Sequence, residues 1–414
     1  MTLGSLTPVD WGVVAAAVIG HFGLHLAAFN RINATGFSSR IVKRISLGLI
    51  LSALLIPLWA AGTLATTAGM GPLDENSHDN LAIWQVFPPG WIVYGCICLA
   101  STLILGIPWL LARPIFGIGH VRAKRRVEIV RLQRLMEPPA TLTGHSHWWS
   151  KIPGNQMLEL AVERIDLPII GLPAGLDGYR IAQLSDLHFT GHVSPAWTTE
   201  VVSRMNDWSP DLVALTGDII DAPECIEWLA EALGHAEAPD GRFFILGNHD
   251  VRKVSPEQVR EAMRTLGWTD VGGRAVQALL RRGRDAIGPA GIATLILGNE
   301  APWGPVPQID QTAPSDGDEP HFRLLLSHSP DQFGWARRHG VQLMLAGHTH
   351  GGQGRLPLIG PVISPSWHGS RYASGDFYRA PTTLHVSRGL SGTHLMRFRC
   401  RPELSLLTLR RAPV

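Results

Sequence analysis

Cysteine is scarce in this chain of 414 residues, which contains only four. Cys96 and Cys98 fall inside an apolar run, so only Cys225 and Cys400 are left for the rest of the chain. This excludes a disulfide framework and a C-x-x-C zinc site, and it suits a reducing compartment. The chain also has no large excess of positive or negative charge. The formal net charge is only +2, so nucleic acid is not expected as a partner.

Charged residues are missing from three long runs near the N-terminus. Trp11–Phe29, Leu47–Ala65 and Trp91–Ala112 contain no Asp, Glu, Lys or Arg. Each run is about twenty residues long, the length of helix that crosses a hydrocarbon core about 30 Å thick. We therefore predict three transmembrane helices within residues 1–116, rather than buried helices of a soluble domain. A cleaved signal peptide is not expected, because the first ten residues hold no Lys or Arg.

The loops between these runs differ in charge. The first loop is basic, the second is acidic, and the segment after the third run is rich in arginine. The residues concerned are Arg31, Arg40, Lys43 and Arg44, then Asp74, Glu75 and Asp79, then Arg113, Arg122, Lys124, Arg125, Arg126, Arg131 and Arg134. Basic loops remain in the cytoplasm. We predict a multi-pass protein of a bacterial inner membrane, with its N-terminus outside and everything after Ala112 inside.

Two histidines lie in the first run. His21 and His25 are four residues apart, so they share one face of a helix. Ionisable groups within a membrane can mark a functional path. The favoured interpretation is nevertheless a neutral pair that hydrogen-bonds to a neighbouring helix.

Residues 117–157 are predicted to form a basic juxtamembrane helix and a linker. Val121–Met136 combines arginines with interleaved Val and Leu, so as a helix it would lie on the inner leaflet, contacting membrane lipids, or act as a solvated connector. His145–Ser150, which contains Trp148 and Trp149, is expected to form a loop near the membrane interface.

Residues 158–414 change to short apolar runs separated by Gly, Pro and Asp, which predicts an α/β domain built around packed sheets. The expected strands are Arg180–Leu184, Leu212–Leu215, Phe243–Leu246, Ile292–Leu297, Phe322–Leu326, Val341–Leu345, Thr383–Val386 and Leu404–Leu409. The expected helices are Ala196–Asn206, Ile226–Leu233, Asp331–Arg338 and one with Ser255 as N-cap, Pro256 in its first turn, Gln258 closing a capping box and Gly267 as terminator.

Five of these strands are followed directly by side chains that can bind a metal. Asp186 and His188 follow the first strand, Asp218 the second, and Asn248, His249 and Asp250 the third. The other two endings supply His328 and the pair His348 and His350. Ligand sites of α/β folds gather at the carboxyl ends of strands. Packing alone does not explain five such endings, so we expect these residues to meet in one site.

Carboxylate, carboxamide and imidazole groups without thiolates suit Mn²⁺, Fe²⁺, Zn²⁺ or Mg²⁺. These side chains offer too many ligands for one tetrahedral ion but fit two ions that share a carboxylate. Such a pair of ions, about 3.5–4 Å apart, converts a bound water into a hydroxide nucleophile. It also stabilises the attacking and leaving oxygens when the hydroxide displaces a group from phosphorus.

The ordered motifs D-x-H, G-D, G-N-H-D, H and G-H-x-H resemble those of the calcineurin-like metallophosphoesterase superfamily. The stretches D-G-Y-R-I-A-Q-L-S-D-L-H and G-H-T-H-G-G-Q are similar to its bacterial YkuE/YaeI-type branch. The resemblance implies a four-layer αββα sandwich of two mixed sheets. It also implies one metal on Asp186, His188, Asp218 and His350, and a second on Asp218, Asn248, His328 and His348. His249 would protonate the leaving oxygen, with Asp250 orienting it.

These features lead us to expect a membrane-anchored phosphoesterase with two divalent metal ions. Some members of the superfamily cleave the pyrophosphate bond of UDP-2,3-diacylglucosamine, which suggests a lipid-linked phosphodiester or pyrophosphate as substrate. The alternative is a soluble nucleotide or glycerophosphodiester, with the spans serving only as an anchor. A non-catalytic membrane receptor or scaffold is a remote third possibility, because every core motif is intact. The sequence makes no prediction of oligomeric state.

Overall fold

The computed structural model describes residues 8–69, 87–111, 119–131, 146–282, 291–300, 321–392 and 394–412. The chain divides into two compact units, Met1–Ile118 and Gly119–Val414. Residues from Gly119 onward belong to the second unit.

The described residues of the first unit include three apolar helical stretches, each long enough to cross a membrane. α1 is Pro8–Asn33, α2 is Ser39–Gly69, and α4 (Pro89–Ser101) continues through a π-helical turn, η2 (Thr102–Gly106), into α5 (Ile107–Leu111). The stretches that meet the length and hydropathy of a span are Trp11–Asn33, Ser39–Thr66 and Pro89–Leu111. The three predicted runs therefore coincide with helices, although Ala112 lies outside the described residues.

The two histidines of α1 hydrogen-bond to neighbouring helices, as predicted. The ring of His21 contacts the Tyr94 hydroxyl at 2.7 Å and the carbonyl of Ala53 at 3.1 Å. His25 contacts the Ser52 hydroxyl at 2.9 Å. Tyr94 belongs to α4, and Ala53 and Ser52 belong to α2. These bonds satisfy polar atoms within an apolar helix group and give the pair a structural role.

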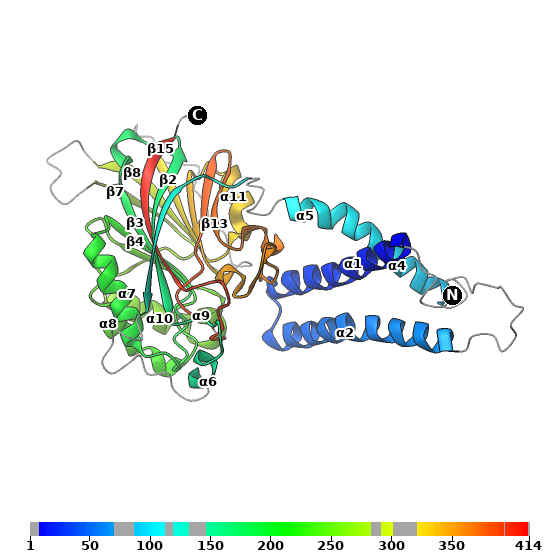
Figure 1. Ribbon diagram of the computed structural model, residues 1–414. Helices are drawn as coiled ribbons and strands as arrows, with labels where there is room; N and C mark the ends of the chain where they lie inside the picture. The colour runs from blue at the N-terminus through cyan, green and yellow to red at the C-terminus, as the bar shows by residue number, and fades with distance from the viewer. Residues whose placement is uncertain are drawn as a thin grey trace, which may run out of the picture. The chain divides into compact units, whose positions relative to one another are not determined.

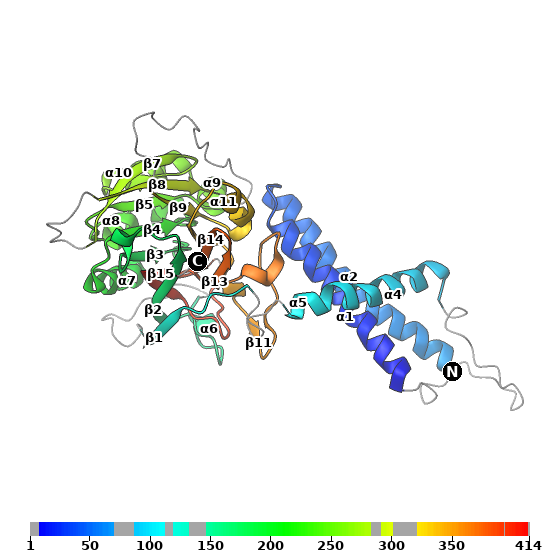
Figure 2. The same ribbon diagram turned by 90° about the horizontal axis from the view of Figure 1, so that it is seen from above.

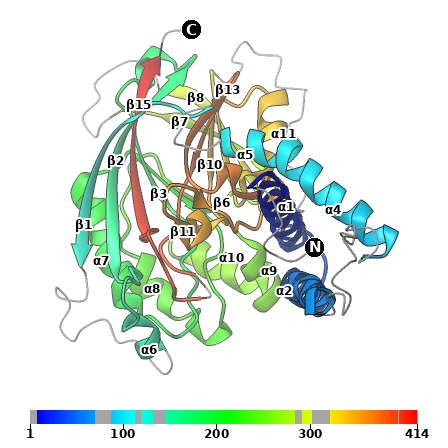
Figure 3. The ribbon, with the colours of Figure 1, turned by 45° about the vertical axis from the view of Figure 1, so that its right-hand side comes forward.

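The second unit is a sandwich of two mixed sheets (Figure 1). One sheet has the order β1-β2-β15-β3-β4-β5-β6, and β1, β2 and β15 lie side by side in both Figures 2 and 3. Its strands are β1 (Lys124–Arg131), β2 (Glu159–Ile170), β3 (Arg180–Leu184), β4 (Leu212–Thr216), β5 (Arg242–Ile245), β6 (Thr269–Asp270) and β15 (Glu403–Ala412). From β3 to β6 the neighbouring strands are parallel.

The second sheet faces the first (Figure 3) and has the order β13-β14-β10-β9-β8-β7. Its four central strands are parallel, and the two edge strands are antiparallel to their neighbours. The strands are β7 (Ala275–Leu280), β8 (Ile292–Asn299), β9 (Phe322–Ser327), β10 (Leu343–Ala346), β13 (Gly375–Arg379) and β14 (Thr382–Val386). A separate hairpin pairs β11 (Arg355–Leu356) with β12 (Gly360–Pro361).

Three hydrophobic cores define the layers. The core between the sheets includes Ile181, Leu212 and Leu343. The core outside the larger sheet includes residues of α7 (Pro195–Trp208), α8 (Trp228–Leu233) and α10 (Pro256–Thr265). The core outside the smaller sheet includes residues of α11 (Phe333–Arg338). The αββα sandwich implied by the resemblance is therefore confirmed.

All eight predicted strands are present in the sandwich. The helix ending at Gly267 is also present, as α10, with Pro256 at its start and Gly267 at φ +79° just beyond its end. The capping box is absent, since the side chain of Ser255 caps no backbone N–H. The strands β2, β6, β7, β11, β12 and β13 are not among those predicted from the sequence.

The basic helix predicted within 121–136 is wrong where the structure describes it. Residues 124–131 form β1, which pairs antiparallel with β2. Val127 and Ile129 are β-branched, a side-chain shape that favours strands. Cross-strand ion pairs add to this, because Arg164 lies 3.3 Å from Glu128. The predicted loop at 145–150 is also wrong, since Ser146–Ser150 forms the short helix α6, while His145 lies outside the described residues.

Candidate metal centre

Five parallel strands deliver all the predicted metal ligands to one end of the sandwich. Three strands, β3, β4 and β5, belong to the larger sheet, and β9 and β10 belong to the smaller one. The ligands follow these strands within a few residues as Asp186, His188, Asp218, Asn248, His328, His348 and His350. The two sheets therefore contribute to the same site.

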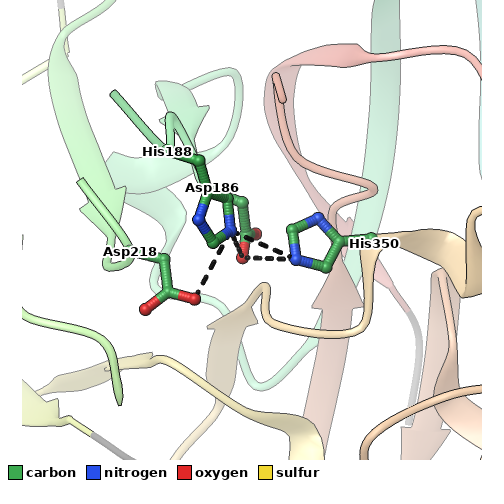
Figure 4. Close-up of side chains that lie close together, drawn as sticks. All are labelled: Asp186, His188, Asp218 and His350. Atoms are coloured by element: carbon green, nitrogen blue, oxygen red, sulfur yellow. Dashed lines mark hydrogen bonds and ion pairs between the residues drawn. The ribbon is translucent and has the colours of Figure 1, made fainter. Parts of the chain in front are cut away.

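Four of these side chains form one cluster (Figure 4). The Nε2 atoms of His188 and His350 face each other at 3.2 Å. His350 Nε2 lies 3.7 Å from Oδ1 of Asp186, and His188 Nε2 lies 3.5 Å from Oδ2 of Asp218. Two imidazole nitrogens and two carboxylates thus surround one point, which is a donor set that suits a divalent cation.

A second cluster adjoins the first and shares Asp218 with it. Nε2 of His328 lies 3.4 Å from Asp218 Oδ2 and 3.1 Å from Asn248 Oδ1. Nδ1 of His348 lies 3.0 Å from the same His328 nitrogen. Since Asp218 Oδ2 is near histidines of both clusters, this carboxylate is placed to bridge two ions.

The outer nitrogens of three histidines are held by other groups. Nδ1 of His188 contacts Asp221 at 3.1 Å, Nδ1 of His328 contacts the carbonyl of Thr216 at 2.9 Å, and Nδ1 of His350 contacts the carbonyl of Ser391 at 3.2 Å. Such partners fix the ring and leave the inward Nε2 atom for a metal. The residues therefore fit the divalent metals that this donor set indicates.

Burial keeps two of the ligands neutral. It lowers the pKa of both His348 and His350, with help from neighbouring histidines. Neutral imidazole is the form that binds metal ions. Burial opposes ionisation of Asp218, but His328, His249 and His188 outweigh it and hold the pKa of that carboxyl well below its usual range. Asp218 is therefore an anionic ligand.

The backbone at the site is in a conformation that most residues avoid. Five candidate ligands have positive φ angles, +53° at Asp186, +44° at His188, +51° at Asp218, +70° at His348 and +49° at His350. For residues with a Cβ this region costs about 1–3 kcal/mol. The surrounding fold must supply that energy, which is typical of functional sites.

His249 lies beside both clusters and is partly exposed, with 23% of its side chain accessible. Its ring packs edge-on against His188 with centroids 4.7 Å apart. Its Nδ1 atom lies 2.8 Å from Asp221 Oδ1, which also contacts His188. Asp221 therefore orients both rings.

The predicted role of Asp250 is contradicted by these contacts. Its buried carboxylate accepts hydrogen bonds from the backbone N–H groups of Ile219, Ile220 and Gly247 at 2.8–3.1 Å. Asp250 thus joins the loop after β4 to the start of α9 (Asn248–Lys253). The orienting residue that the sequence reasoning missed is Asp221, which follows Asp218 by three residues in G-D-I-I-D.

A buried arginine supports the loop that carries His350 and was also missed. The Arg397 side chain is 2% exposed. Its guanidinium donates to the carbonyls of His350, Arg388 and Ser391. A single planar group thereby joins the loop after β10 to the loop after β14. No motif in the sequence signals this role, because it depends on three distant carbonyls.

The fold and donor set define the class of this protein as a two-sheet α/β sandwich with a site that can hold divalent metal ions. The sequence profile of the calcineurin-like phosphoesterases matches residues 179–352. The uncharacterized metallophosphoesterase YkuE of Bacillus subtilis is 32% identical over 275 residues, which cover 66% of this chain and 92% of the relative. The chain belongs to the calcineurin-like metallophosphoesterase family and is a phosphoester hydrolase.

Two further relatives have more specific names. The phosphodiesterase YaeI of Escherichia coli is 29% identical over 238 residues, covering 56% of this chain and 82% of YaeI. The UDP-2,3-diacylglucosamine pyrophosphatase LpxG of Chlamydia trachomatis is 24% identical over 303 residues, covering 60% of this chain and 88% of LpxG. The relatives thus differ in the phosphoester that their names specify.

Proposed function

We propose that this protein is a membrane-anchored phosphoesterase that uses two divalent metal ions to hydrolyse a lipid-linked phosphodiester or pyrophosphate on the cytoplasmic face of a bacterial inner membrane. The observation that carries the two-metal part is the sharing of Asp218 between the two clusters. Two bound ions would supply a hydroxide nucleophile at neutral pH and would neutralise charge on the phosphoryl oxygens.

The side chains of the protein have distinct roles in this proposal. Asp186, His188 and His350 would hold one ion, Asn248, His328 and His348 would hold the other, and Asp218 would contribute to both. His249 is the accessible group beside them, so it donates a hydrogen bond to the phosphoryl group and a proton to the leaving oxygen. Asp221 accepts from Nδ1 of His249 and so directs the other ring nitrogen toward the substrate.

The lipid-linked substrate is supported by two features. The described residues include three helices that are long and apolar enough to cross a membrane. The chain is also similar to a relative named for the hydrolysis of UDP-2,3-diacylglucosamine. Tethering beside the bilayer raises the local concentration of a substrate that is confined to the same surface.

The substrate class is tested with the purified full-length chain in nanodiscs with Mn²⁺. Turnover of UDP-2,3-diacylglucosamine to UMP and the lipid monophosphate is compared with turnover of UDP-glucosamine, which lacks acyl chains. We expect kcat/KM to be at least about tenfold higher for the acylated substrate, since tethering favours a surface-confined ligand. Equal values would contradict the lipid-linked proposal.

The Asp218→Ala variant is the control for both substrates, because it removes the ligand common to the two clusters. A chromogenic phosphodiester provides a third readout of the same site. Hydrolysis of any of them by Asp218→Ala at the wild-type rate would contradict the two-metal proposal.

The second candidate function is a phosphodiesterase for a soluble nucleotide or glycerophosphodiester. It is favoured by the similarity to YaeI, which is named a phosphodiesterase. In that case the helices would be an anchor only. Faster turnover of a short soluble diester than of any acylated substrate would establish this alternative.

The orientation is tested with single cysteines in intact bacterial cells. Ser38→Cys lies between the first two candidate spans and Ser77→Cys between the second and third. A maleimide that cannot cross membranes should label Ser77→Cys but not Ser38→Cys, because the basic loop is expected inside. The opposite labelling would place the metal centre on the outer side.

A further inference from the structure

Exposed apolar side chains of the second unit are concentrated in one short segment. Of the eleven large hydrophobic residues that the described part of this unit exposes, five fall within 356–367. They are Leu356 (49% exposed), Leu358 (88%), Ile359 (39%), Ile363 (50%) and Trp367 (53%). Scattered exposed residues are normal on a protein surface, but a cluster of this kind marks an interaction site.

The geometry of the β11–β12 hairpin keeps its tip away from the protein core. The two strands share only the pairs Arg355 with Pro361 and Leu356 with Gly360. Leu358 sits at the tip with a φ angle of +62°, a conformation that leucine rarely adopts. Its side chain is almost fully exposed, so the tip holds an apolar group in the solvent at an energetic cost to the isolated domain.

The base of this hairpin is attached to the metal centre. Arg355 Nε donates to the carbonyl of Gly351, the residue after His350, at 3.1 Å. A Cβ atom added to Gly352 would lie only 2.5 Å from Cβ of Pro361, so the loop and the hairpin are in tight contact. A surface that held the hairpin tip would therefore also fix the position of the metal site.

The charge of the segment indicates what kind of surface this is. Residues 355–368 contain no Asp or Glu, whereas they include Arg355 and His368. The exposed Arg399 lies beside Phe398, which forms an isolated bridge with Gly354 at the hairpin base. Exposed leucine and isoleucine at the hairpin tip and arginines at its base match the apolar interior and the anionic head groups of a bilayer.

A second aromatic element is connected to the same base. Asn155 forms an isolated bridge with Phe398 and donates to the carbonyl of Trp149 at 2.8 Å. Trp148 and Trp149 of α6 are 73% and 42% exposed. Tryptophan is enriched at the boundary between lipid and water because its ring is apolar and its N–H is polar.

The chain length keeps a bilayer within reach. Twelve residues separate Leu111, where α5 ends, from Lys124, where β1 begins. A connection of this length extends at most about 45 Å. If the candidate spans lie in a membrane, the second unit is therefore held close to it.

We propose that the β11–β12 hairpin, together with Ile363 and Trp367, inserts into the head-group boundary of the bilayer and positions the metal centre over the phosphate groups of lipids. Insertion of the hairpin depends only on the exposed apolar side chains and not on which substrate the enzyme hydrolyses. Its effect on turnover rests on the lipid-linked substrate proposed above, so the two are measured separately.

Insertion is measured on the full-length chain in liposomes of phosphatidylethanolamine and phosphatidylglycerol. A single cysteine at Leu358→Cys, in a Cys96→Ser background, carries an environment-sensitive fluorophore; the other three cysteines are buried. The matched control is Leu279→Cys on β7, a residue that is 55% exposed. Nitroxide-labelled lipids should quench the label at 358 severalfold more than the label at 279, and aqueous iodide should do the reverse.

Two results would overturn the insertion. The first is equal quenching of both positions by the lipid nitroxide. The second is protection of position 358 from both quenchers, which would mean that protein covers the hairpin, either the helices of this chain or a second copy. Sedimentation of the labelled chain with the liposomes after carbonate washing verifies that it is anchored.

The effect on turnover is measured with Leu358→Glu and the matched Leu279→Glu. We expect Leu358→Glu to lower kcat/KM for the diacylated substrate in liposomes about tenfold, the loss that corresponds to one unburied leucine. Hydrolysis of a soluble chromogenic diester should be unchanged, and Leu279→Glu should change neither. Equal loss with both substrates would contradict the proposal. A wild-type protein without activity on the acylated substrate would refute only the proposed substrate, since the fluorescence result stands independently.

Discussion

Asp221 contacts the imidazole rings of both His249 and His188. Its Oδ1 atom lies 2.8 Å from Nδ1 of His249 and 3.1 Å from Nδ1 of His188. Lys253 contacts the other oxygen at 2.9 Å. The same carboxylate thus orients a candidate proton donor and a candidate metal ligand.

We predict that Asp221→Asn lowers kcat for a soluble phosphodiester about 10–100-fold, the usual effect of losing a partner that orients a ligand. The loss should persist at saturating Mn²⁺, because His249 is misoriented even when metal is bound. Lys253→Met is the matched control, since it leaves both contacts with the histidines intact, and its kcat should change less than about twofold. An unchanged kcat in Asp221→Asn would show that His249 needs no such partner.

Metal content should depend on which cluster is altered. His350→Ala removes a ligand from the first cluster only and His348→Ala from the second only, so each should retain about one tightly bound ion out of two. Asp218→Ala should lose both, because its carboxylate is common to the clusters. Mass spectrometry of metals after dialysis against a weak chelator measures the ratio. Identical losses in all three variants would contradict separate ion sites.

The backbone of Gly347 lies so close to Ser185 and Asp186 that one added methyl group should strongly reduce activity. A Cβ atom on Gly347 would lie 1.9 Å from Oγ of Ser185 and 2.5 Å from Oδ2 of Asp186. Gly347→Ala must therefore displace Asp186, and we expect at least about a 100-fold loss of kcat/KM, as misplacement by about 1 Å produces. Gly354→Ala is the control in the same loop region, because its Cβ would meet no atom within 4 Å. Activity measured with a chromogenic diester should be close to normal in that variant.

The sequence predicted the ligand-bearing strands because they are buried on both faces. Residues 212–216 and 343–346 are entirely buried, so they read as continuous apolar runs that end at a polar residue. In β1 only one residue of eight is buried, and charges lie on both faces. The spacing of its apolar residues is compatible with a helix as well as with a strand. Residues 124–131 form a strand because they pair with β2, and this pairing is not visible in the local sequence.

The assignment of Asp250 failed for a related reason. It follows His249 directly in the chain, but successive residues of a helix point in directions about 100° apart. The side chain therefore turns to the backbone N–H groups of Ile219 and Gly247. Asp221 reaches His249 from the loop after β4, and nothing in a linear pattern separates it from an ordinary loop aspartate.

The placement of β1 within the fold leads to a prediction about stability. The guanidinium of Arg125 donates to the buried carboxylates of Glu163 and Asp376. We expect Arg125→Met to lower the free energy of unfolding by about 3 kcal/mol, since it leaves these buried charges incompletely paired. Thermal unfolding should shift downward by about 6–10 °C.

Arg126→Met is the matched control for this change. Arg126 is the neighbouring residue on the same strand and is exposed. Its replacement should change the midpoint by less than about 2 °C, because exposed charges contribute little. Equal shifts in the two variants would argue against β1 as an integral strand of the sandwich.

Each of the two ligand clusters draws its side chains from both sheets. Asp186, His188 and Asp218 come from the larger sheet, whereas His328, His348 and His350 come from the smaller one. Two bound metal ions would therefore cross-link the two sheets of the sandwich. Metal–ligand bonds tolerate much smaller changes in distance and angle than contacts between apolar side chains do. Metal binding and the stability of the fold are then linked, because ions that bind only the folded state stabilise it. Loss of metal would therefore make this protein more susceptible to proteolysis as well as inactive.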